Sequence, residues 1–449
     1  MVALMHDDLS QAIDDLFPSV RADYERLIRI PSVSAPEYDP TGVRASAELT
    51  MELLEEAGVG GVRTLHVEGC DHPAVYGEIS APDGAPTVTL YAHHDVQPTG
   101  PLDEWDSEPF EPSERDGRIY GRGTSDDKSG IAIHLAAIRA HGGSPPVGIK
   151  LFIEGEEESG SEHLDDYMRV HGELLACDAI VIADSGNWRT GQPGLATSLR
   201  GLVDLIVEVK TLRYAVHSGE FGGALPDALT SMSRMLASLH NPNGEVAVVG
   251  LVSGEADPLD LTEEELRAQS GALEGVELIG EGSLTSRMWT KPSISVLAID
   301  APPVAEAINQ LVASARAKIS LRLAPGDDPQ RAVEALTAHL EANVPWGAQL
   351  KVTPGSLGQP YSLETTGPYF DAFRTGFETA WGKEAVNMGV GGSIPFVAAF
   401  EAIHPNATAL LTGAADDKSR AHGPNESVDI TDLRNSMLAE AVALRLMAG

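Results

Sequence analysis

The chain has 449 residues, of which 42% are apolar and 22% are charged, the proportions of an ordinary globular protein with room for more than one core. Acidic residues outnumber basic ones by 67 to 31, and the net charge of −36 argues against nucleic acid or an anionic membrane surface as a partner. No apolar run is long enough to span a bilayer, and the N-terminal segment lacks a signal-peptide pattern. With only two cysteines, the expected location is the reducing cytoplasm.

The first 200 residues alternate strand-like apolar runs with helical stretches, a pattern typical of an α/β domain with a mostly parallel sheet. Helical spacing over 43–57 ends at a glycine. Strands are predicted at 87–91, 149–153 and 179–183, and a buried helix at 130–141.

The pattern changes near residue 200. The next elements follow the order β-α-β-β-α-β of a ferredoxin-like domain. They are strands at 203–209, 294–299, 318–323 and 349–352 and helices at 227–239 and 329–340. Helix–strand alternation then resumes and closes with a helix over 431–447. We therefore expect an α/β catalytic domain made of 1–199 and 357–449, interrupted by an inserted α+β lid and dimerisation domain at 200–356.

Histidine and acidic residues come directly after three of the predicted strands. His93 and Asp95 follow the first strand, Glu157 and Glu158 the second, and Asp184 the third. Ligands of open α/β sheets bind outside the carboxyl ends of the strands, so these side chains are expected at one common edge.

Two further segments add candidates to this edge. The segment GRGTSDDK brings Asp126 just before the buried helix, and His422 follows a late strand in AHGPNES. A crowd of carboxylates and imidazoles is electrostatically unfavourable unless a cation lies among them, and mixed His and carboxylate ligands suit Zn²⁺ and Mn²⁺. Taken singly, 154–158 also fits a solvated helix start, and each histidine fits a structural role. The joint pattern favours a metal centre.

Several motifs in the same order resemble those of the M20 metallopeptidase family, which contains carnosinase-type dipeptidases, carboxypeptidases and aminoacylases. They are IPSVS, YAHHDVQP, WDSEPFEPSERDGRIYGRGTSDDKSG and EGEEESGS, and the resemblance extends to the final helix. It implies a mostly parallel-sheet hydrolase domain with an inserted lid, in agreement with the periodicity.

The resemblance also implies two divalent ions per subunit, with zinc as the first choice and manganese as the alternative. One ion would be held by His93, Asp126 and Asp184. The other would be held by Asp126, Glu158 and His422, so that Asp126 bridges both.

Other residues receive roles through the same resemblance. Asp95 would orient the ring of His93, and Glu157 would be the general base for the water between the ions. His217, in AVHSGEFGG, would reach into the partner subunit's site and stabilise the oxyanion, which implies a homodimer. Arg322, in ISLRLAP, would bind the substrate carboxylate. The alternatives are a structural turn for the histidine and an ordinary surface charge for the arginine.

The resemblance also indicates a pocket loop and a subfamily. Gly391, Gly392 and Ser393 match a loop that lines the substrate pocket, although a glycine pair also suits any tight turn. The long stretch 242–292 resembles the dipeptidase branch, as does aspartate at position 184. Carnosinase-type enzymes usually carry Arg-Glu directly before GGSIP, whereas this chain has Gly389-Val390.

The function expected from all this is metal-dependent hydrolysis of the amide bond of dipeptides or small peptides that have a free C-terminal carboxylate. The alternative is an N-acyl- or N-carbamoyl-amino-acid amidohydrolase with the same metal centre. A third hypothesis, an inactive relative that serves as a scaffold, is disfavoured because every ligand position and the base are present.

Overall fold

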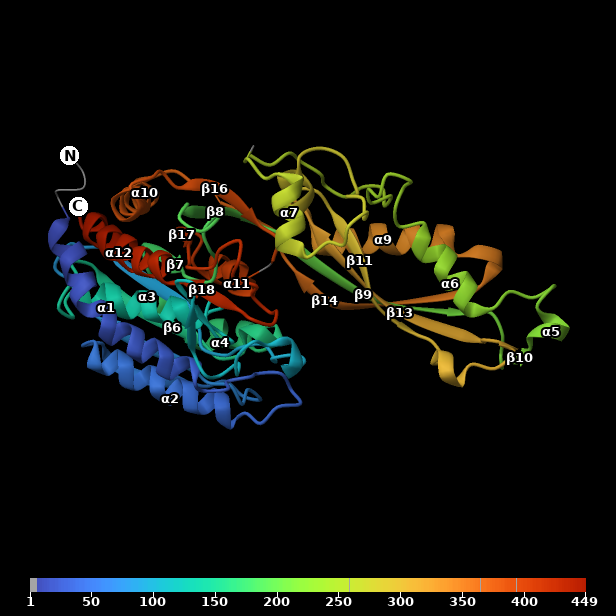
Figure 1. Ribbon diagram of the computed structural model, residues 1–449, viewed down its shortest axis with the longest axis horizontal. Coiled ribbons are helices and arrows are strands. Elements are labelled where there is room, and N and C mark those ends of the chain that lie inside the picture. The colour runs from blue at the N-terminus through green and yellow to red at the C-terminus, as the bar shows by residue number, and fades with distance from the viewer. Residues whose placement is uncertain (1–5, 258, 364, 393) are drawn as a thin grey trace. The chain divides into compact units, whose positions relative to one another are not determined.

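The computed structural model describes residues 6–257, 259–363, 365–392 and 394–449. The chain forms two compact units. The first unit consists of Met1–Thr197, Leu363–Met388 and Ile394–Gly449, and the second of Ser198–Ser362 and Gly389–Ser393 (Figure 1). No helix in the described part of the chain is long and apolar enough to cross a membrane.

The central sheet has the strand order β1-β2-β6-β3-β7-β17-β8-β15, with β16 paired to β8. Its four middle strands are mutually parallel: β6 (Gly148–Glu154), β3 (Thr87–His93), β7 (Ala179–Ile182) and β17 (Thr408–Leu411). The flanking strands are β1 (Gly60–Leu65), β2 (Ala74–Ile79), β8 (Gly194–Leu199), β15 (Tyr361–Ser362) and β16 (Val386–Val390). The α/β class expected from the alternating pattern is confirmed.

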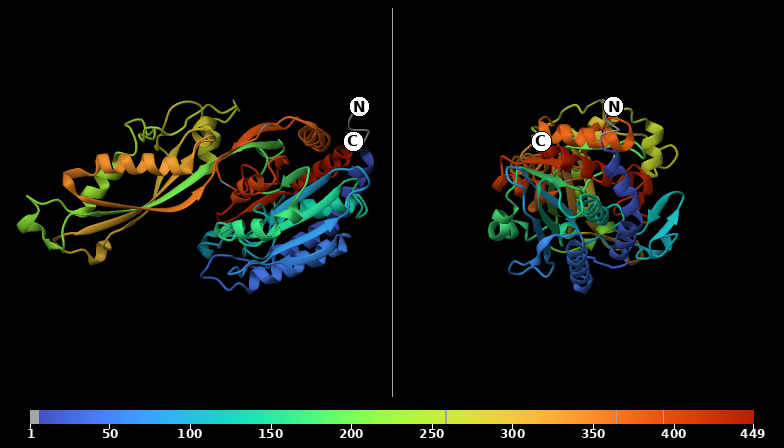
Figure 2. Two further views of the ribbon diagram at one scale, coloured as in Figure 1. Left: turned by 180° about the vertical axis from the view of Figure 1, so that it is seen from behind. Right: turned by 90° about the vertical axis from the view of Figure 1, so that its left-hand side faces the viewer.

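Helices cover both faces of the parallel strands, which explains why these strands are apolar almost throughout (Figures 1 and 2). Five helices share the main core: α1 (Asp7–Ile28), α2 (Thr41–Glu56), α3 (Lys128–Ala140), α10 (Pro368–Trp381) and α12 (Ile430–Met447). On the opposite face lie α4 (Leu164–His171) and α11 (Pro395–Ile403), where Tyr91, Phe152 and Phe396 stack on one another. A small sheet of β4 (Ser113–Arg115), β5 (Arg118–Tyr120) and β18 (Ser427–Asp429) lies apart from these layers.

Alternation along β3 determines what its end presents. Val88, Leu90 and Ala92 belong to the main core, so Tyr91 and His93 point to the opposite face. The last residue of the strand therefore places an imidazole at the carboxyl edge of the sheet.

The second unit is built on an antiparallel sheet with the order β11-β13-β9-β14. Its strands are β9 (Gly201–Lys210), β11 (Ser293–Asp300), β13 (Ser314–Leu323) and β14 (Gln349–Gly358). The helices α6 (Ala228–Ala237) and α9 (Pro329–Asn343) pack on one face of this sheet and close a separate core (Figure 2). The chain order β9-α6-β11-β13-α9-β14 is the predicted β-α-β-β-α-β. Shorter elements are β10 (Val216–His217), α5 (Ser218–Phe221), α7 (Glu263–Ser270), α8 (Leu284–Trp289) and β12 (Gln310–Leu311).

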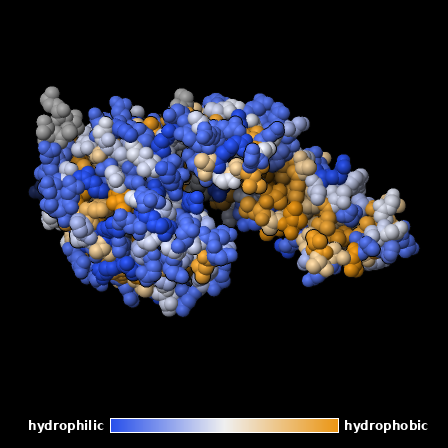
Figure 3. Space-filling model, viewed as in Figure 1, coloured by the Kyte–Doolittle hydropathy of each residue, from blue (hydrophilic) through white to orange (hydrophobic). Residues whose placement is uncertain are grey.

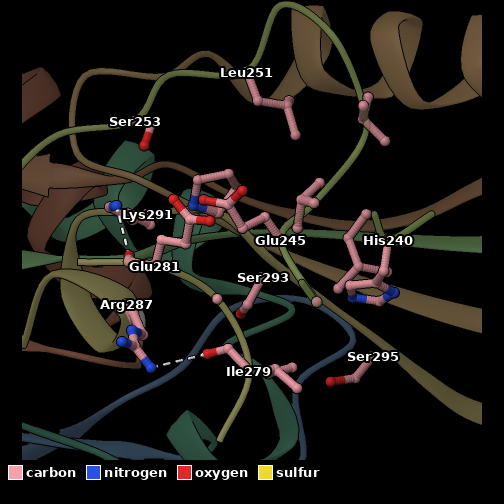
Figure 4. A pocket seen from close by; sticks show the side chains of 16 residues that line it. His240, Glu245, Leu251, Ser253, Ile279, Glu281, Arg287, Lys291, Ser293 and Ser295 are labelled. Carbon is pink, nitrogen blue, oxygen red and sulfur yellow. Dashed lines mark hydrogen bonds between the residues drawn. The ribbon is translucent and has the colours of Figure 1, made fainter. Parts of the chain in front are cut away.

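The long stretch 242–292 forms most of the wall of a cavity of about 350 Å³ within the second unit (Figure 4). Lys291 and Arg287 lie at one end and His240 at the other, with Glu245 between them. Lys291 Nζ donates to the carbonyl of Glu281 at 2.8 Å. The described residues of this stretch therefore contribute to a cavity of the second unit.

Candidate metal centre

His93, at the end of β3, lies among carboxylates that come from two other segments. Its Nε2 is 3.0 Å from Asp126 Oδ1 and 3.8 Å from Asp184 Oδ1. Asp126 lies on the loop before α3, and Asp184 follows β7, the strand beside β3. The parallel strands thus bring the predicted side chains to one edge, as expected for an open α/β sheet.

His422 approaches Asp126 from the other side. Its Nε2 is 3.0 Å from Asp126 Oδ2 and 3.1 Å from Glu158 Oε2. Each oxygen of Asp126 therefore faces a different imidazole. The His422 backbone has a φ of 63°, which is rare for a residue with a side chain, so its loop holds the ring in place against local strain. Its side chain is 59% exposed, which leaves the centre open to solvent on this side.

The loop that carries Asp126 is held by hydrogen bonds from two directions. Residues 126 and 127 are joined by a cis peptide bond, and the side chain of Asp127 caps α3 by accepting from Gly130 N. Glu426 Oε1 accepts from the backbone N–H groups of Ser125 and Asp126 at 2.8 and 3.1 Å. Its Oε2 accepts from Arg122 at 2.7 Å.

Asp95 connects His93 to the loop that follows β6. Its Oδ1 lies 3.4 Å from His93 Nδ1, and its carboxylate accepts the backbone N–H groups of Glu157 and Glu158 at 3.3 and 3.0 Å. Ser34 Oγ donates to the same carboxylate at 2.6 Å. His93 Nδ1 faces only acceptors, Asp95 O at 3.1 Å among them, so Nδ1 carries the proton. Its Nε2 is then directed at Asp126.

The acidic groups of the centre strongly perturb one another. Burial, and after it the charge of Asp184, raises the pKa of Glu157 well above its usual range. Burial and Asp126 raise the pKa of Glu158 to about 7. For His422 the hydrogen bonds to Asp126 and Glu158 outweigh burial and raise the pKa to about 11. Burial and like charges thus raise the pKa of the two glutamates, and the neighbouring carboxylates raise that of His422.

The donor set fits divalent metal ions. Ligand atoms of His93, Asp126 and Glu158 lie within 4.8 Å of one another, and so do those of His93, Glu157 and Asp184. Imidazole nitrogen with carboxylate oxygen is a ligand combination for Zn²⁺ or Mn²⁺, and a divalent cation would relieve the repulsion among these acids.

The remaining predicted residues belong to the second unit. His217 is an exposed residue at the end of β10, where it pairs with Gln310 of β12. Arg322, on β13, lies close enough to the buried Arg200 that burial together with the charge of Arg322 lowers the pKa of Arg200 to about 10. Gly391 and Gly392 are exposed, and the carbonyl of Gly392 accepts from Arg200 N at 3.1 Å. Ser393 lies outside the described residues.

Gly389 is a glycine for a steric reason. A Cβ at this position would lie 2.6 Å from Trp289, closer than real Cβ contacts come. The indole occupies the space that a side chain would need. The packing of this unit therefore excludes a side chain at position 389.

Two supporting residues were not predicted from the sequence. Glu426, described above, lies four residues after His422, and Gln97 Nε2 donates to Glu158 Oε2 at 2.8 Å. Both lie inside segments that were recognised for other residues, YAHHDVQP and AHGPNES. Their role depends on backbone groups and on contacts distant in sequence, which a motif does not display.

Comparison with known proteins identifies the family of the chain. A family model described as peptidase family M20/M25/M40 matches residues 89–444. The cysteinylglycine-S-conjugate dipeptidase of Corynebacterium striatum is 34% identical over 417 residues, covering 91% of this chain and 90% of that protein. The β-Ala-His dipeptidase of Rattus norvegicus is 30% identical over 380 residues, covering 80% of this chain and 76% of the relative.

Solved structures show the same fold. The dipeptidase Dug1p from Saccharomyces cerevisiae superposes with a TM-score of 0.84 at 24% identity, with 98% of each chain covered. Human carnosine dipeptidase 1 has a TM-score of 0.83 at 23% identity, with the same coverage. The chain belongs to the M20 peptidase family, and the class of enzyme is an M20-type metallopeptidase.

Proposed function

We propose that this enzyme hydrolyses the amide bond of dipeptides that carry a free C-terminal carboxylate, with two divalent metal ions bound at the His93–Asp126–His422 centre. The observation that carries the proposal is Asp126, whose two oxygens each face a separate imidazole at 3.0 Å. A carboxylate between two nitrogen ligands is the arrangement needed to share it between two cations.

The ligand assignment follows the contacts. His93, Asp126 and Asp184 would hold one ion, and Asp126, Glu158 and His422 the other. When bound, the ions supply positive charge that polarises the substrate carbonyl and makes water more acidic. Zinc is the first candidate and manganese the second.

Glu157 is the proposed general base. It follows β6, and its backbone N–H is anchored to Asp95, so its position is defined without the use of its own carboxylate. This carboxylate would take a proton from the attacking water and deliver it to the leaving amine. Asp95 would act indirectly, by holding the His93 ring and the Glu157–Glu158 backbone.

Substrate recognition is assigned to the second unit. The guanidinium of Arg322 would bind the substrate carboxylate, and Gly391, Gly392 and Ser393 would line the pocket. Arg322→Lys should raise KM for dipeptides more than it lowers kcat, because the lysine ammonium cannot make the two parallel hydrogen bonds that a planar guanidinium makes to a carboxylate. If KM is unchanged, Arg322 does not bind the substrate.

His217 would act in the site of a partner subunit within a homodimer. Four exposed apolar side chains on β9 and the edge strand β11 support an interface there (Figure 3): Ile206, Val296, Leu297 and Ile299. Inactive His217→Ala and Glu157→Gln variants should regain activity when mixed and allowed to exchange subunits, since one site of the mixed dimer then has both residues. If the mixture has no activity, His217 does not act in trans.

The substrate class rests on the dipeptidase names of the relatives and on the lid segment 242–292. One observation favours the alternative, an N-acyl- or N-carbamoyl-amino-acid amidohydrolase. Gly389-Val390 stands where carnosinase-type enzymes usually carry Arg-Glu, and Trp289 leaves no room for a side chain at Gly389. The proposed location is the cytoplasm. Cys70 and Cys177 are both free thiols, as expected in a reducing compartment.

The deciding experiment measures amino acid release from a panel of unblocked dipeptides and from matched N-acetyl and N-carbamoyl amino acids. Metal-stripped protein is compared with protein reloaded with Zn²⁺ or Mn²⁺. Metal-dependent cleavage of the unblocked dipeptides is the expected result. Cleavage of the blocked compounds alone would replace the proposal with the alternative, and no cleavage of either class would overturn both.

A further inference from the structure

A second group of metal-ligating side chains lies in the first unit, outside the centre described above. Cys70 comes from the loop between β1 and β2, Glu156 from the loop after β6, and His163 immediately precedes α4. Ligand atoms of the three residues all lie within 4.8 Å of one another. Glu156 Oε2 is 3.3 Å from Cys70 Sγ and 3.0 Å from His163 Nδ1.

The spacing of these atoms is close to that of a tetrahedral zinc site. Bonds of about 2.3 Å to sulfur and about 2.0–2.1 Å to nitrogen or oxygen place neighbouring ligand atoms about 3.3–3.5 Å apart. The two measured separations differ from that range by a few tenths of an ångström at most. Small side-chain rotations would admit an ion.

The surroundings leave these groups available. Glu156 is 3% exposed, and its other oxygen already accepts from the backbone N–H of His163 at 2.6 Å, which directs Oε2 toward the sulfur and the imidazole. Cys70 and His163 are partly exposed, so an ion has a route of entry. Burial and the charge of Glu156 raise the pKa of the Cys70 thiol to about 12, so without a cation the thiol keeps its proton. Its acceptors are the carbonyl of His72 at 3.2 Å and Glu156 Oε2 at 3.3 Å.

We propose that Cys70, Glu156 and His163 form a third divalent-metal site, selective for zinc-like ions, with a fourth position open to water. The sulfur, nitrogen and oxygen donors match Zn²⁺ and exclude Ca²⁺ and Mg²⁺, which take oxygen ligands. Binding displaces the thiol proton, and the imidazolium proton where His163 is charged, to solvent, so that the ligands bind as thiolate and neutral imidazole.

The site is mechanically linked to the loop that carries Glu157 and Glu158. Glu156 precedes both, and its carbonyl accepts the N–H groups of Ser159 and Ser161 at 3.2 and 3.0 Å. An ion on the Glu156 carboxylate would therefore fix the first residue of this turn. The role is structural: the ion contacts neither the substrate nor the proposed base.

The test is a titration of the metal-free full-length protein with Co²⁺, which reports sulfur ligation by a near-ultraviolet sulfur-to-cobalt charge-transfer band. The wild type should bind three equivalents per chain and develop the band. Cys70→Ser should bind two equivalents without the band, and His163→Gln should also lose the third equivalent. Cys177→Ser is the matched control, because it removes the other free thiol and should keep both the band and the third equivalent.

Two results would overturn the proposal. One is a wild-type protein that binds no more Co²⁺ than Cys70→Ser. The other is a charge-transfer band that persists in Cys70→Ser or disappears in Cys177→Ser, which would assign the sulfur ligand elsewhere. The circular dichroism of each metal-free variant is compared with that of the wild type. If Cys70→Ser does not fold, the loss of the third equivalent in His163→Gln tests the proposal instead.

Discussion

Asp95→Asn tests how the centre is held together, because the substitution keeps the shape of the side chain and changes its hydrogen bonding. Oδ1 of Asp95 accepts from Glu157 N and faces His93 Nδ1. Oδ2 accepts from Glu158 N and Ser34 Oγ. An amide retains only one accepting oxygen. Whichever way it is oriented, its NH₂ group meets at least one backbone N–H, which loses its acceptor.

The magnitude follows from these contacts. A buried donor left without an acceptor destabilises the protein by about 1–3 kcal/mol. Loss of the partner that orients a ligating histidine lowers metal affinity about 10–100-fold, or about 1.4–2.7 kcal/mol. We therefore expect Asp95→Asn to bind its metals at least tenfold more weakly and the metal-free variant to unfold at a lower denaturant concentration.

The assay is metal binding by competition with a chelator of known affinity, alongside denaturant unfolding of the metal-free protein. Ser34→Ala is the matched control, since it removes one donor to Asp95 and leaves every acceptor in place. It should change metal affinity less than Asp95→Asn does. A folded Asp95→Asn protein with wild-type metal affinity would refute the role assigned to Asp95.

Three further outcomes are expected. His217→Ala should lose turnover and keep its full metal content, measured by kinetics and elemental analysis, because His217 is not a proposed ligand. Gly389→Ala should lower the free energy of unfolding by about 1–3 kcal/mol, since its methyl group would overlap Trp289. Burial lowers the pKa of His134, but Glu440, 2.8 Å away, outweighs burial and raises it. The pair therefore stabilises the metal-free fold fully below pH 6.5 and less as pH rises through the raised pKa, and His134→Gln should flatten this part of the denaturant-derived stability profile.

For each of these predictions, a specific result would contradict the reasoning. Loss of metal from His217→Ala would make it a ligand or a folding residue. Gly392→Ala is the control for Gly389→Ala, because no atom lies within 4 Å of the Cβ it would add. Equal destabilisation by the two alanines would mean that the Trp289 contact is not the cause. A His134→Gln profile that still falls as steeply with pH would assign the titration to another group.

The sequence predicted the parallel strands of the first unit and the elements of the second unit well. β3, β6 and β7 are covered on both faces, so each is an apolar run that is easily recognised in the sequence. The predicted histidine and acidic residues lie at or just after the end of each strand. The β-α-β-β-α-β order was readable from the strand and helix periodicities of its apolar residues, and α6 and α9 each follow an aspartate that caps the helix. The limits of elements were less exact: β13 begins at Ser314, four residues before the predicted strand.

The parts that the sequence did not predict depend on distant contacts. Glu426 supports the loop of Asp126 by accepting backbone N–H groups that lie 300 and 301 residues away in the chain, and no local pattern encodes such a contact. The Cys70 group has the same character, because Cys70 lies 86 residues before Glu156 in the chain. In the sequence Gly389 is only a departure from a motif. The side chain that leaves no room for a Cβ there, Trp289, lies 100 residues earlier.

The most direct test of the account is the turnover of an unblocked dipeptide by Glu157→Gln at measured metal occupancy. Glutamine keeps the size of the side chain and cannot accept the proton. The account predicts a kcat at least about 10²–10⁴-fold below that of the wild type, with the same number of metal ions bound at unchanged affinity. Wild-type turnover would contradict the role of Glu157 as base. Loss of metal together with turnover would make Glu157 a ligand, and the assignment of the two neighbouring glutamates would then have to be exchanged.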